Sequence, residues 1–319
     1  MKSSFFPAET KVPLLGQDAH LCRLRTTFGG HTVFLFGDAP DDFAIGGNKV
    51  RFYEFLLPDI LQKKPQVLLT SGSLYSNHIR VSAEIAKRYG MECHLILTAD
   101  HPGEEYLAQK NNLSLAVALG AKCVFAGGFA AMLKIEEYKK QLTQQGISYY
   151  HVPNAGHAPG AFRAYADVMG EAYARLSALS VSPSRIFLPC ASGTTAAGVM
   201  EGAALLRSAG TAVPDVTVFR VSNSPRGAER GIRELLRGAE GYPGALACDS
   251  LPEIADCGKN DYGKPDAELL ALREQIFREE GVLLDRTYNI NAFYGMVKSL
   301  EAHPGTSDVL YLHTGGFSE

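Results

Sequence analysis

The feature that most constrains the fold is a regular alternation of short apolar strands with segments of helical length. Between residues 67 and 152, aliphatic and β-branched stretches alternate with longer amphipathic ones, and the turns between them are short. This alternation predicts a parallel sheet covered by helices. The expected strands are 67–70, 93–97, 122–125 and 149–152, and the expected helices are 76–89, 104–119 and 129–145.

A second series of elements flanks this region on both sides. Residues 1–45 read as an irregular arm ending in a strand, and a Gly-, Pro- and Asp-rich segment, 238–265, is expected to form a long loop. The further strands are 32–36, 185–189, 216–221 and 309–312, with an apolar stretch at 282–284, and the further helices are 51–63, 161–179, 266–280 and 292–301.

The length of the chain, 319 residues, exceeds the usual size of a single hydrophobic core. We therefore expect an α/β protein with a two-domain, three-layer α/β/α architecture. Residues 1–52 and 161–319 would form a large discontinuous domain, and residues 53–160 a small inserted α/β domain.

Composition excludes several classes of function. The hydrophobic share of 46%, the charged share of 20% and the net charge of −3 are ordinary for a globular enzyme and give no footprint for nucleic acid or an acidic membrane. The first residues lack the apolar core expected of a signal peptide, and the sequence has no apolar stretch of about 18 residues. Six dispersed cysteines without a Cys-x-x-Cys pair predict reduced thiols, a cytoplasmic location and no cysteine-rich zinc site.

Lys49 is the strongest candidate for covalent chemistry. It follows Gly46, Gly47 and Asn48 at the start of an expected helix, where a cation is not favoured. A lysine in that setting suits an amine kept neutral for a Schiff base with a carbonyl cofactor. The alternative is a loop lysine in solvent, which is the common case for an unselected lysine.

Two hydroxyl-rich turns, each passing from a strand into a helix, are candidate anion sites. In Thr70–His78, Ser73 or Ser76 would cap the helix, and its free N–H groups would bind a substrate carboxylate; the alternative is a simple N-cap. The second turn suits a phosphate and lacks the Gly-Lys-Ser/Thr of a nucleotide P-loop. It contains Ser192, Gly193, Thr194 and Thr195.

Two further groups complete the candidate site. Thr314, in the His-Thr-Gly-Gly sequence after the last strand, could hydrogen-bond a ring nitrogen, or the segment could be a turn without a role. Tyr262 and Tyr288 lie in loop-like settings and could transfer protons, or be only packed aromatics. A reactive lysine, a phosphate turn, a carboxylate site and phenols together indicate pyridoxal 5′-phosphate (PLP) acting on an amino acid, and no metal motif is found.

The chain resembles the D-cysteine desulfhydrase and 1-aminocyclopropane-1-carboxylate (ACC) deaminase family, which belongs to the fold-type II PLP enzymes. The resemblance runs from about residue 36 to residue 317. It is carried by Gly-Gly-Asn-Lys-Val-Arg at 46–51, Ser-Asn-His-Ile-Arg at 76–80, the turn at 192–195, the segment 280–288 and His-Thr-Gly-Gly at 313–316.

The resemblance implies a role for each matched position. Lys49 would bind PLP, Asn77 would contact its ring hydroxyl, and residues 192–195 its phosphate, while Asn289 or Thr314 would lie beside the ring nitrogen. The substrate would meet Tyr75, Ser76, Asn77 and His78, and the catalytic residues would be Lys49, Ser76, Tyr262 and Tyr288.

The chain departs from the family near the substrate. Tyr75 stands where the family has Gln, and Asn289-Ile290-Asn291-Ala292 replaces the Thr-Gly-Lys-Ala of desulfhydrases. ACC deaminases carry a Glu at the position of Asn289, and an amide cannot stabilise a pyridinium as a carboxylate does.

We therefore expect a lyase that performs α,β-elimination on a small β-substituted amino acid such as D-cysteine, giving an α-keto acid and ammonia. By resemblance the protein would be a homodimer. Three alternatives remain open: an ACC deaminase, a β-substituting synthase, and a non-catalytic PLP-binding homologue.

Overall fold

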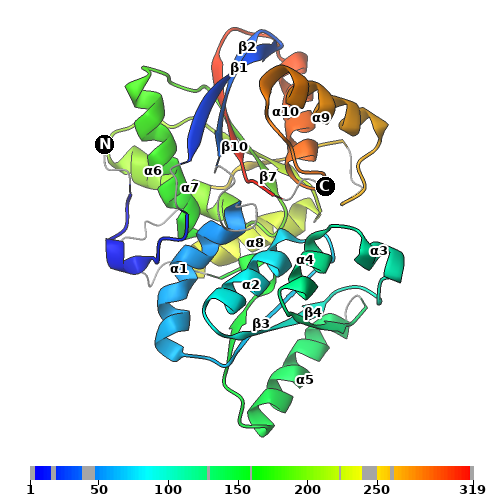
Figure 1. Cartoon of the computed structure of the whole chain (residues 1–319). Coiled ribbons are helices and arrows are strands. Elements are labelled where there is room, and N and C mark those ends of the chain that lie inside the picture. Colours follow the sequence, from blue (N-terminus) through cyan, green and yellow to red (C-terminus); the bar gives the residue numbers. More distant parts are fainter. Residues whose placement is uncertain are drawn as a thin grey trace.

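The computed structural model describes residues 4–15, 19–37, 47–127, 130–158, 160–222, 224–238, 250–258 and 262–316. Figure 1 shows two sheets with helices packed around them. The larger sheet has six strands in the order β1-β2-β10-β7-β8-β9, and only its β1–β2 pair is antiparallel. Its strands are β1 (His20–Phe28), β2 (His31–Gly37), β7 (Ile186–Cys190), β8 (Val216–Arg220), β9 (Glu253–Asp256) and β10 (Asp308–His313).

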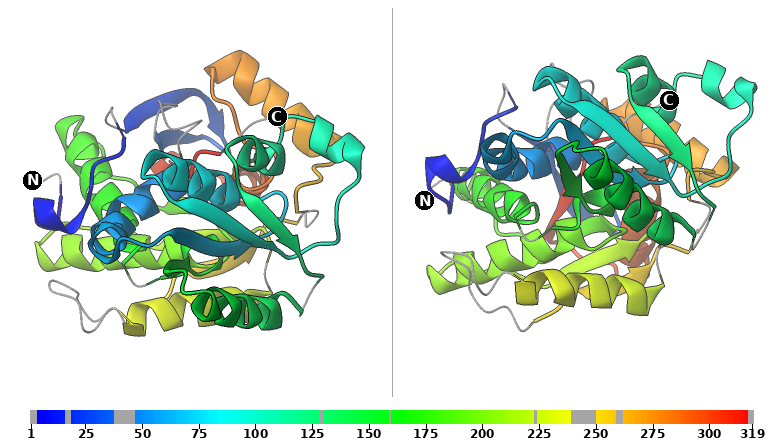
Figure 2. Two further views of the ribbon diagram at one scale, coloured as in Figure 1. Left: turned by 60° about the horizontal axis from the view of Figure 1, so that its bottom comes forward. Right: turned by 90° about the horizontal axis from the view of Figure 1, so that it is seen from below.

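The smaller sheet is entirely parallel, with four strands in the order β5-β4-β3-β6. In β3, Leu68 faces the main core while Val67 and Leu69 face a separate cluster with α5 (Ala130–Gln144). The strand runs between α2 (Asn77–Arg88) and α5 in the left view of Figure 2. The four strands are β3 (Val67–Gly72), β4 (Glu92–Leu97), β5 (Lys122–Phe125) and β6 (Tyr149–Val152).

Helices also cover both faces of the larger sheet. Along β7, Ile186 and Leu188 belong to the core shared with α6 and α7, whereas Phe187 belongs to the core shared with α9 and α10. A strand buried on both faces reads as a continuous apolar run, as 186–190 does. The helices are α6 (Arg163–Ala178), α7 (Thr194–Ser208), α8 (Pro225–Gly238), α9 (Ala267–Glu280) and α10 (Asn289–Ala302).

Two helices carry the chain from one sheet to the other. α1 (Asn48–Lys63) leads from β2 to β3, and α6 leads from β6 back to β7. They are joined by a bidentate ion pair, in which the Arg51 guanidinium donates to the Glu171 carboxylate at 3.1 and 2.9 Å. The α/β fold with two sheets agrees with the sequence prediction, and we propose that the domain boundaries lie at 52/53 and 160/161 as expected.

One predicted helix is in fact two. The segment 104–119 forms α3 (Glu104–Ala108) and α4 (Asn112–Ala118), separated by an extended Asn111. The Asn111 side chain accepts from the Ser114 N–H at 2.8 Å, and the Asn111 N–H donates to the Ser114 hydroxyl at 2.9 Å. This capping box starts a new helix, because an Asn side chain can accept a hydrogen bond from a free N–H group of the first turn. Asn is therefore more favourable at an N-cap than inside a helix.

Four other expectations are corrected. The arm expected to be irregular contains β1, which pairs with β2 through a turn at Gly29–Gly30 with φ of +57° and +85°. The expected loop contains β9 in its described part, while residues 239–249 and 259–261 lie outside the described residues. The helix expected at 292–301 begins at Asn289, and residues 282–284 form no strand.

Within the described part of the chain, no helix has the length and apolar character needed to cross a bilayer. The same residues contain no group of three or more His, Cys, Asp or Glu side chains placed to hold a metal ion.

Candidate active site

A pocket lies where the carboxyl ends of strands from both sheets meet. It consists of a narrow cavity of about 30 Å³ over the start of α7 and a wider one of about 190 Å³. The two cavities share Ala191, Ser192 and Tyr288 as lining residues. Ligands of parallel α/β proteins bind at this edge of the sheet, so the pocket is in the expected place.

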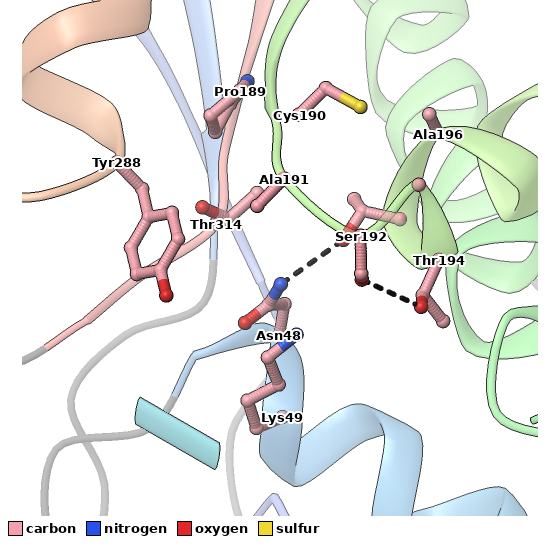
Figure 3. A pocket seen from close by; sticks show the side chains of 12 residues that line it. Asn48, Lys49, Pro189, Cys190, Ala191, Ser192, Thr194, Ala196, Tyr288 and Thr314 are labelled. Atoms are coloured by element: carbon pink, nitrogen blue, oxygen red, sulfur yellow. Dashed lines mark hydrogen bonds between the residues drawn. The ribbon is translucent and has the colours of Figure 1, made fainter. Parts of the chain in front are cut away.

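Lys49 lines the narrow cavity from the first turn of α1 (Figure 3). Its side chain is buried, its Nζ donates to the Ala155 carbonyl oxygen at 3.1 Å, and the same atom lies 4.5 Å from the centre of the Phe52 ring. Burial lowers the pKa of Lys49 to about 7. The alternative of a loop lysine in solvent is therefore wrong, and a large share of the amine is neutral near pH 7.

The carbonyl that receives Lys49 belongs to a residue in an uncommon conformation. Ala155 has φ +59° and ψ +16°, which is left-handed backbone that a non-glycine residue rarely adopts. It lies in the short 3₁₀ turn Asn154–Gly156 after β6, and Asn154 and Ala155 line the wider cavity. Sequence reasoning missed both residues.

Gly47 brings the start of α1 against the end of β10. Gly47 has φ +97°, and a Cβ added at Gly315 would lie only 2.4 Å from the Gly47 Cα. The Asn48 N–H donates to the Thr314 carbonyl oxygen at 2.9 Å. Lys49 and Thr314 are thereby held on the same cavity, although 265 positions separate them in the sequence. Gly46 lies outside the described residues.

The turn at 192–195 forms the floor of the narrow cavity. Gly193 is the N-cap of α7 with φ +91°, and none of the described side chains caps the helix. The first-turn N–H groups of α7 are therefore available to an anion. The Ser192 and Thr194 hydroxyls are 3.0 Å apart, and the Asn48 side-chain amide donates to the Thr195 hydroxyl at 3.0 Å (Figure 3).

Tyr262 and Tyr288 form a phenol pair on the wider cavity. Their hydroxyl oxygens are hydrogen-bonded to each other, and the Ser73 hydroxyl donates to the Tyr262 oxygen at 3.4 Å. The Tyr288 phenol is also hydrogen-bonded to the Ser76 hydroxyl. Burial raises the pKa of both phenols, and the nearby Asp285 carboxylate raises them further, so both stay protonated at neutral pH.

Thr314 lines the cavity, whereas Asn289 lies behind it. The Asn289 amide nitrogen donates to Asp285 Oδ1 at 2.7 Å and to the Gly315 carbonyl oxygen at 2.8 Å, with the Thr314 hydroxyl at 3.3 Å. The Asn289 amide oxygen accepts from the Thr314 N–H at 3.1 Å. The Asn289 side chain is fully buried and is not among the residues that line either cavity.

The segment 75–78 contributes differently from residue to residue. Ser76 lines the wider cavity and caps α2, accepting from the His78 N–H at 3.2 Å. Asn77 is buried beside Gly316, whose added Cβ would lie 3.0 Å from Asn77 Nδ2. His78 and Tyr75 do not line the cavities, and the contacts predicted for them and for Asn77 with substrate or cofactor stay predictions.

His78 has a clear structural contact. Its Nε2 lies 2.8 Å from the Thr70 hydroxyl, which donates to the Val152 carbonyl oxygen at 2.7 Å. Its ring stacks on Tyr53 with 6.0 Å between centres, and burial lowers its pKa to about 3. His78 is therefore a neutral residue of the core at physiological pH.

Several lining residues could have been found from their positions in the sequence. Thr98 comes directly after β4, Asn154 comes two residues after β6, and Ser222 comes two residues after β8. Ligands of parallel sheets bind at the carboxyl ends of the strands, so residues just after a strand are candidates for the site. This rule selects residues 70–78 and 190–198 and applies equally to these three positions. The pocket as built offers a neutral amine, a site for an anion and several hydroxyls, which suits a ligand with a carbonyl and a phosphate.

Comparisons with known proteins agree with this chemistry. Residues 42–315 match the family model described as pyridoxal-phosphate dependent enzyme. A Pyrococcus abyssi protein named as a 1-aminocyclopropane-1-carboxylate deaminase is 30% identical over 314 residues, covering 98% of this chain and 92% of its own. The D-cysteine desulfhydrase of Yersinia enterocolitica is 30% identical over 293 residues, with 90% and 87% covered.

The fold also matches a solved structure. The crystal structure of an ACC deaminase homologue superposes with a TM-score of 0.82 at 26% identity, covering 97% of this chain and 92% of that chain.

Proposed function

The chain belongs to the family of pyridoxal-phosphate dependent enzymes, and we propose that it eliminates the β-substituent of a small amino acid such as D-cysteine. It is a PLP-dependent lyase or deaminase. In the proposed reaction, cysteine and water give pyruvate, ammonia and hydrogen sulfide, so no oxidant or reductant is consumed.

The residues of the pocket fit PLP. Lys49 offers a buried amine whose pKa of about 7 suits covalent attachment to an aldehyde. The glycine N-cap and uncapped first turn of α7 suit the phosphate, and the Thr314 hydroxyl suits the ring nitrogen. When bound, PLP withdraws electrons from the α-carbon of an amino acid and so makes its α-hydrogen acidic.

The protein's own groups then have separate tasks. The neutral Lys49 amine would take the α-proton on its Nζ, and the phenol pair of Tyr262 and Tyr288 would donate a proton to the leaving group. Ser76, as N-cap of α2, would place the substrate carboxylate at the positive end of that helix, next to Asn77.

The observation that carries the proposal is the buried Lys49 amine, which lines the same narrow cavity as the glycine-capped start of α7. Neither feature alone requires PLP, because buried lysines and anion sites both occur elsewhere. Together they supply the two attachments of one phosphorylated aldehyde, which is what the family cofactor is.

Two measurements test the proposal. The purified protein should be yellow, and borohydride reduction should fix the cofactor on Lys49, where peptide mapping would find it; a label on another lysine would contradict the assignment. A screen of D- and L-amino acids with keto-acid detection should give turnover with a β-substituted alanine. Lys49→Ala is the control and should be inactive, and equal activity of this variant would exclude the mechanism.

A second candidate, ACC deamination, is favoured by the names of two of the similar proteins. The placement of Asn289 argues against it, since no carboxylate of the described residues lines the narrow cavity beside Thr314. Substantial release of ammonia from ACC by the wild-type protein would favour this candidate over elimination.

We also propose a cytoplasmic location and a homodimer. Free thiols at Cys22, Cys93, Cys123, Cys190 and Cys257 support a reducing compartment. The dimer is proposed from the family resemblance, and light scattering coupled to size-exclusion chromatography tests it.

A further inference from the structure

Four tyrosine rings form a row beside the pocket, in the order Tyr106, Tyr75, Tyr262, Tyr288. Successive ring centres are 6.1, 6.1 and 5.6 Å apart, and successive planes cross at 90°, 78° and 81°. All three contacts are therefore edge-to-face, the arrangement that aromatic quadrupoles favour. We refer to these four residues as the tyrosine row.

The tyrosine row joins the two sheets. Tyr75 follows β3 and Tyr106 lies in α3, so both belong to the part of the chain around the four-stranded sheet. Tyr262 follows β9 and Tyr288 precedes α10, so both belong to the part around the six-stranded sheet. Tyr262 and Tyr288 line the wider cavity, whereas Tyr75 contacts Tyr262 from outside it.

Tyr75 also packs closely on the residue after Tyr262. A Cβ built on Gly263 would lie 2.7 Å from the Cγ of Tyr75 and 2.9 Å from both Cδ atoms. Only a residue without a side chain allows this approach to the face of the ring, and Gly263 also has φ +78°. The Tyr75 ring thus contacts both Tyr262 and Gly263.

The main chain of Tyr75 is itself firmly held. Its carbonyl oxygen accepts from the Asn112 amide at 3.0 Å, and Asn112 accepts from Arg80 Nε at 2.9 Å. Arg80 is completely buried, and Tyr75 directly precedes Ser76, the N-cap of α2. Tyr75 is therefore fixed to the core around the smaller sheet and offers a stable surface to Tyr262.

We propose that Tyr75 is a positioning residue, whose ring holds Tyr262 in place so that its phenol stays hydrogen-bonded to Tyr288 at the pocket. The inference rests on the proposed function, because it assigns Tyr75 to the phenol pair of that site. It requires the aromatic ring of Tyr75 and not its hydroxyl, since the contacts with Tyr262 and Gly263 are ring contacts.

Chemical modification tests the proposal without using activity. In the holoenzyme, N-acetylimidazole acetylates accessible phenols, and peptide mass spectrometry follows the rate at Tyr262. Tyr75→Leu should raise that rate at least tenfold, while Tyr75→Phe should leave it at the wild-type value. Tyr138→Leu is the matched control, because Tyr138 packs edge-to-face on His94, 5.7 Å between centres, and lines neither cavity.

A second variant covers the case in which Tyr75→Leu does not fold. Gly263→Ala places a methyl group against the Tyr75 ring and should also raise the acetylation rate at Tyr262, because it separates the two rings. The proposal is overturned if Tyr75→Leu and Gly263→Ala both fold and the acetylation rate at Tyr262 in each is no higher than in the Tyr138→Leu control.

Kinetics on an accepted substrate give an independent readout. Loss of the Tyr75 ring should lower kcat by about tenfold or more with a smaller change in KM, and Tyr75→Phe should restore kcat. The alkaline limb of the kcat profile should move to lower pH in Tyr75→Leu, because a more solvated Tyr262 ionises more easily. Changes in KM alone would contradict a positioning role. If the wild-type protein turns over no amino acid, the proposed function fails, while the acetylation result still decides the role of Tyr75.

Discussion

Asp285 Oδ1 accepts hydrogen bonds from both nitrogens of Asn289, from the main-chain N–H at 2.8 Å and from the side-chain amide at 2.7 Å. The other oxygen of Asp285 accepts from the Thr287 and Tyr288 N–H groups at 2.9 and 2.8 Å. A single buried carboxylate thus caps the start of α10 and fixes the amide that in turn orients Thr314.

Asn289→Asp should therefore destabilise the protein in a pH-dependent way. The new carboxyl would face Asp285, and like charges at that distance raise its pKa above the unfolded value of about 4. Stability is then lost as pH rises through and above that value, by about 3–5 kcal/mol when both groups are charged. Urea unfolding at pH 5 and pH 8 measures the loss, which should be larger at pH 8. Asn289→Ala is the control and should lose similar amounts at both pH values.

The depressed pKa of Lys49 predicts a second pH dependence, in the apoprotein. Since the folded pKa is about 7 and the unfolded value is about 10.5, the unfolded chain binds more protons between these values. Burial of Lys49 therefore costs stability below pH 10.5, and the cost reaches its maximum below pH 7. Lys49→Met should be more stable than the wild-type apoprotein by at most about 5 kcal/mol at pH 7. The difference should shrink in denaturation experiments at pH 9 and above, and a difference that does not change with pH would show that Lys49 is not desolvated.

Gly193→Val should abolish cofactor retention. The φ of +91° is strained for any β-branched residue, and the new Cβ would lie 2.9 Å from Ile232 Cγ1 and 3.0 Å from the Ile232 nitrogen. Thr194→Ala keeps the backbone and removes one hydroxyl, so we expect a loss of about 1–3 kcal/mol in PLP binding. Equilibrium dialysis with PLP measures both variants. Wild-type affinity in Gly193→Val would place the phosphate elsewhere.

The ring nitrogen of PLP should remain unprotonated in this enzyme. Its expected neighbour is the Thr314 hydroxyl, and the nearest carboxylate of that network, Asp285, reaches Thr314 only through the Asn289 amide. A neutral ring withdraws fewer electrons, which suits expulsion of a good β-leaving group better than opening of a cyclopropane. Turnover of D-cysteine should exceed that of ACC by at least tenfold in a side-by-side keto-acid assay, and the reverse order would contradict this reading.

Local chemistry could be predicted from the sequence, and contacts between distant segments could not. The environment of Gly47, Lys49 and Gly193 follows from neighbouring residues, because glycines, helix starts and strand ends are encoded within a few positions. The capping box of Asn111 and Ser114 is also encoded within a few positions, so the break in the helix expected at 104–119 could have been predicted from the sequence.

The tertiary contacts needed the structure. The Ala155 carbonyl oxygen is placed to accept from Lys49 by a left-handed backbone conformation at Ala155, and the sequence has no glycine at that position to indicate it. The hydrogen bonds that lead from Asp285 through Asn289 to Thr314 join segments about 25 positions apart. The ring contact between Tyr75 and Tyr262 joins segments that are much further apart in the sequence. Hydrogen bonds and packing of this kind are set by the fold as a whole and leave no short motif.

The position of β10 between β2 and β7 has a consequence for synthesis in the cell. Strand β10 is the last of the described strands to leave the ribosome, yet it pairs with β2 along its whole length, from Asp308 to His313. Until it emerges, β2 and β7 have no partner on that side, and Lys49 has no Thr314 opposite it. The larger sheet therefore cannot close before residues 308–313 have been synthesised, so a premature stop before residue 308 would leave a chain that neither folds this sheet nor retains PLP.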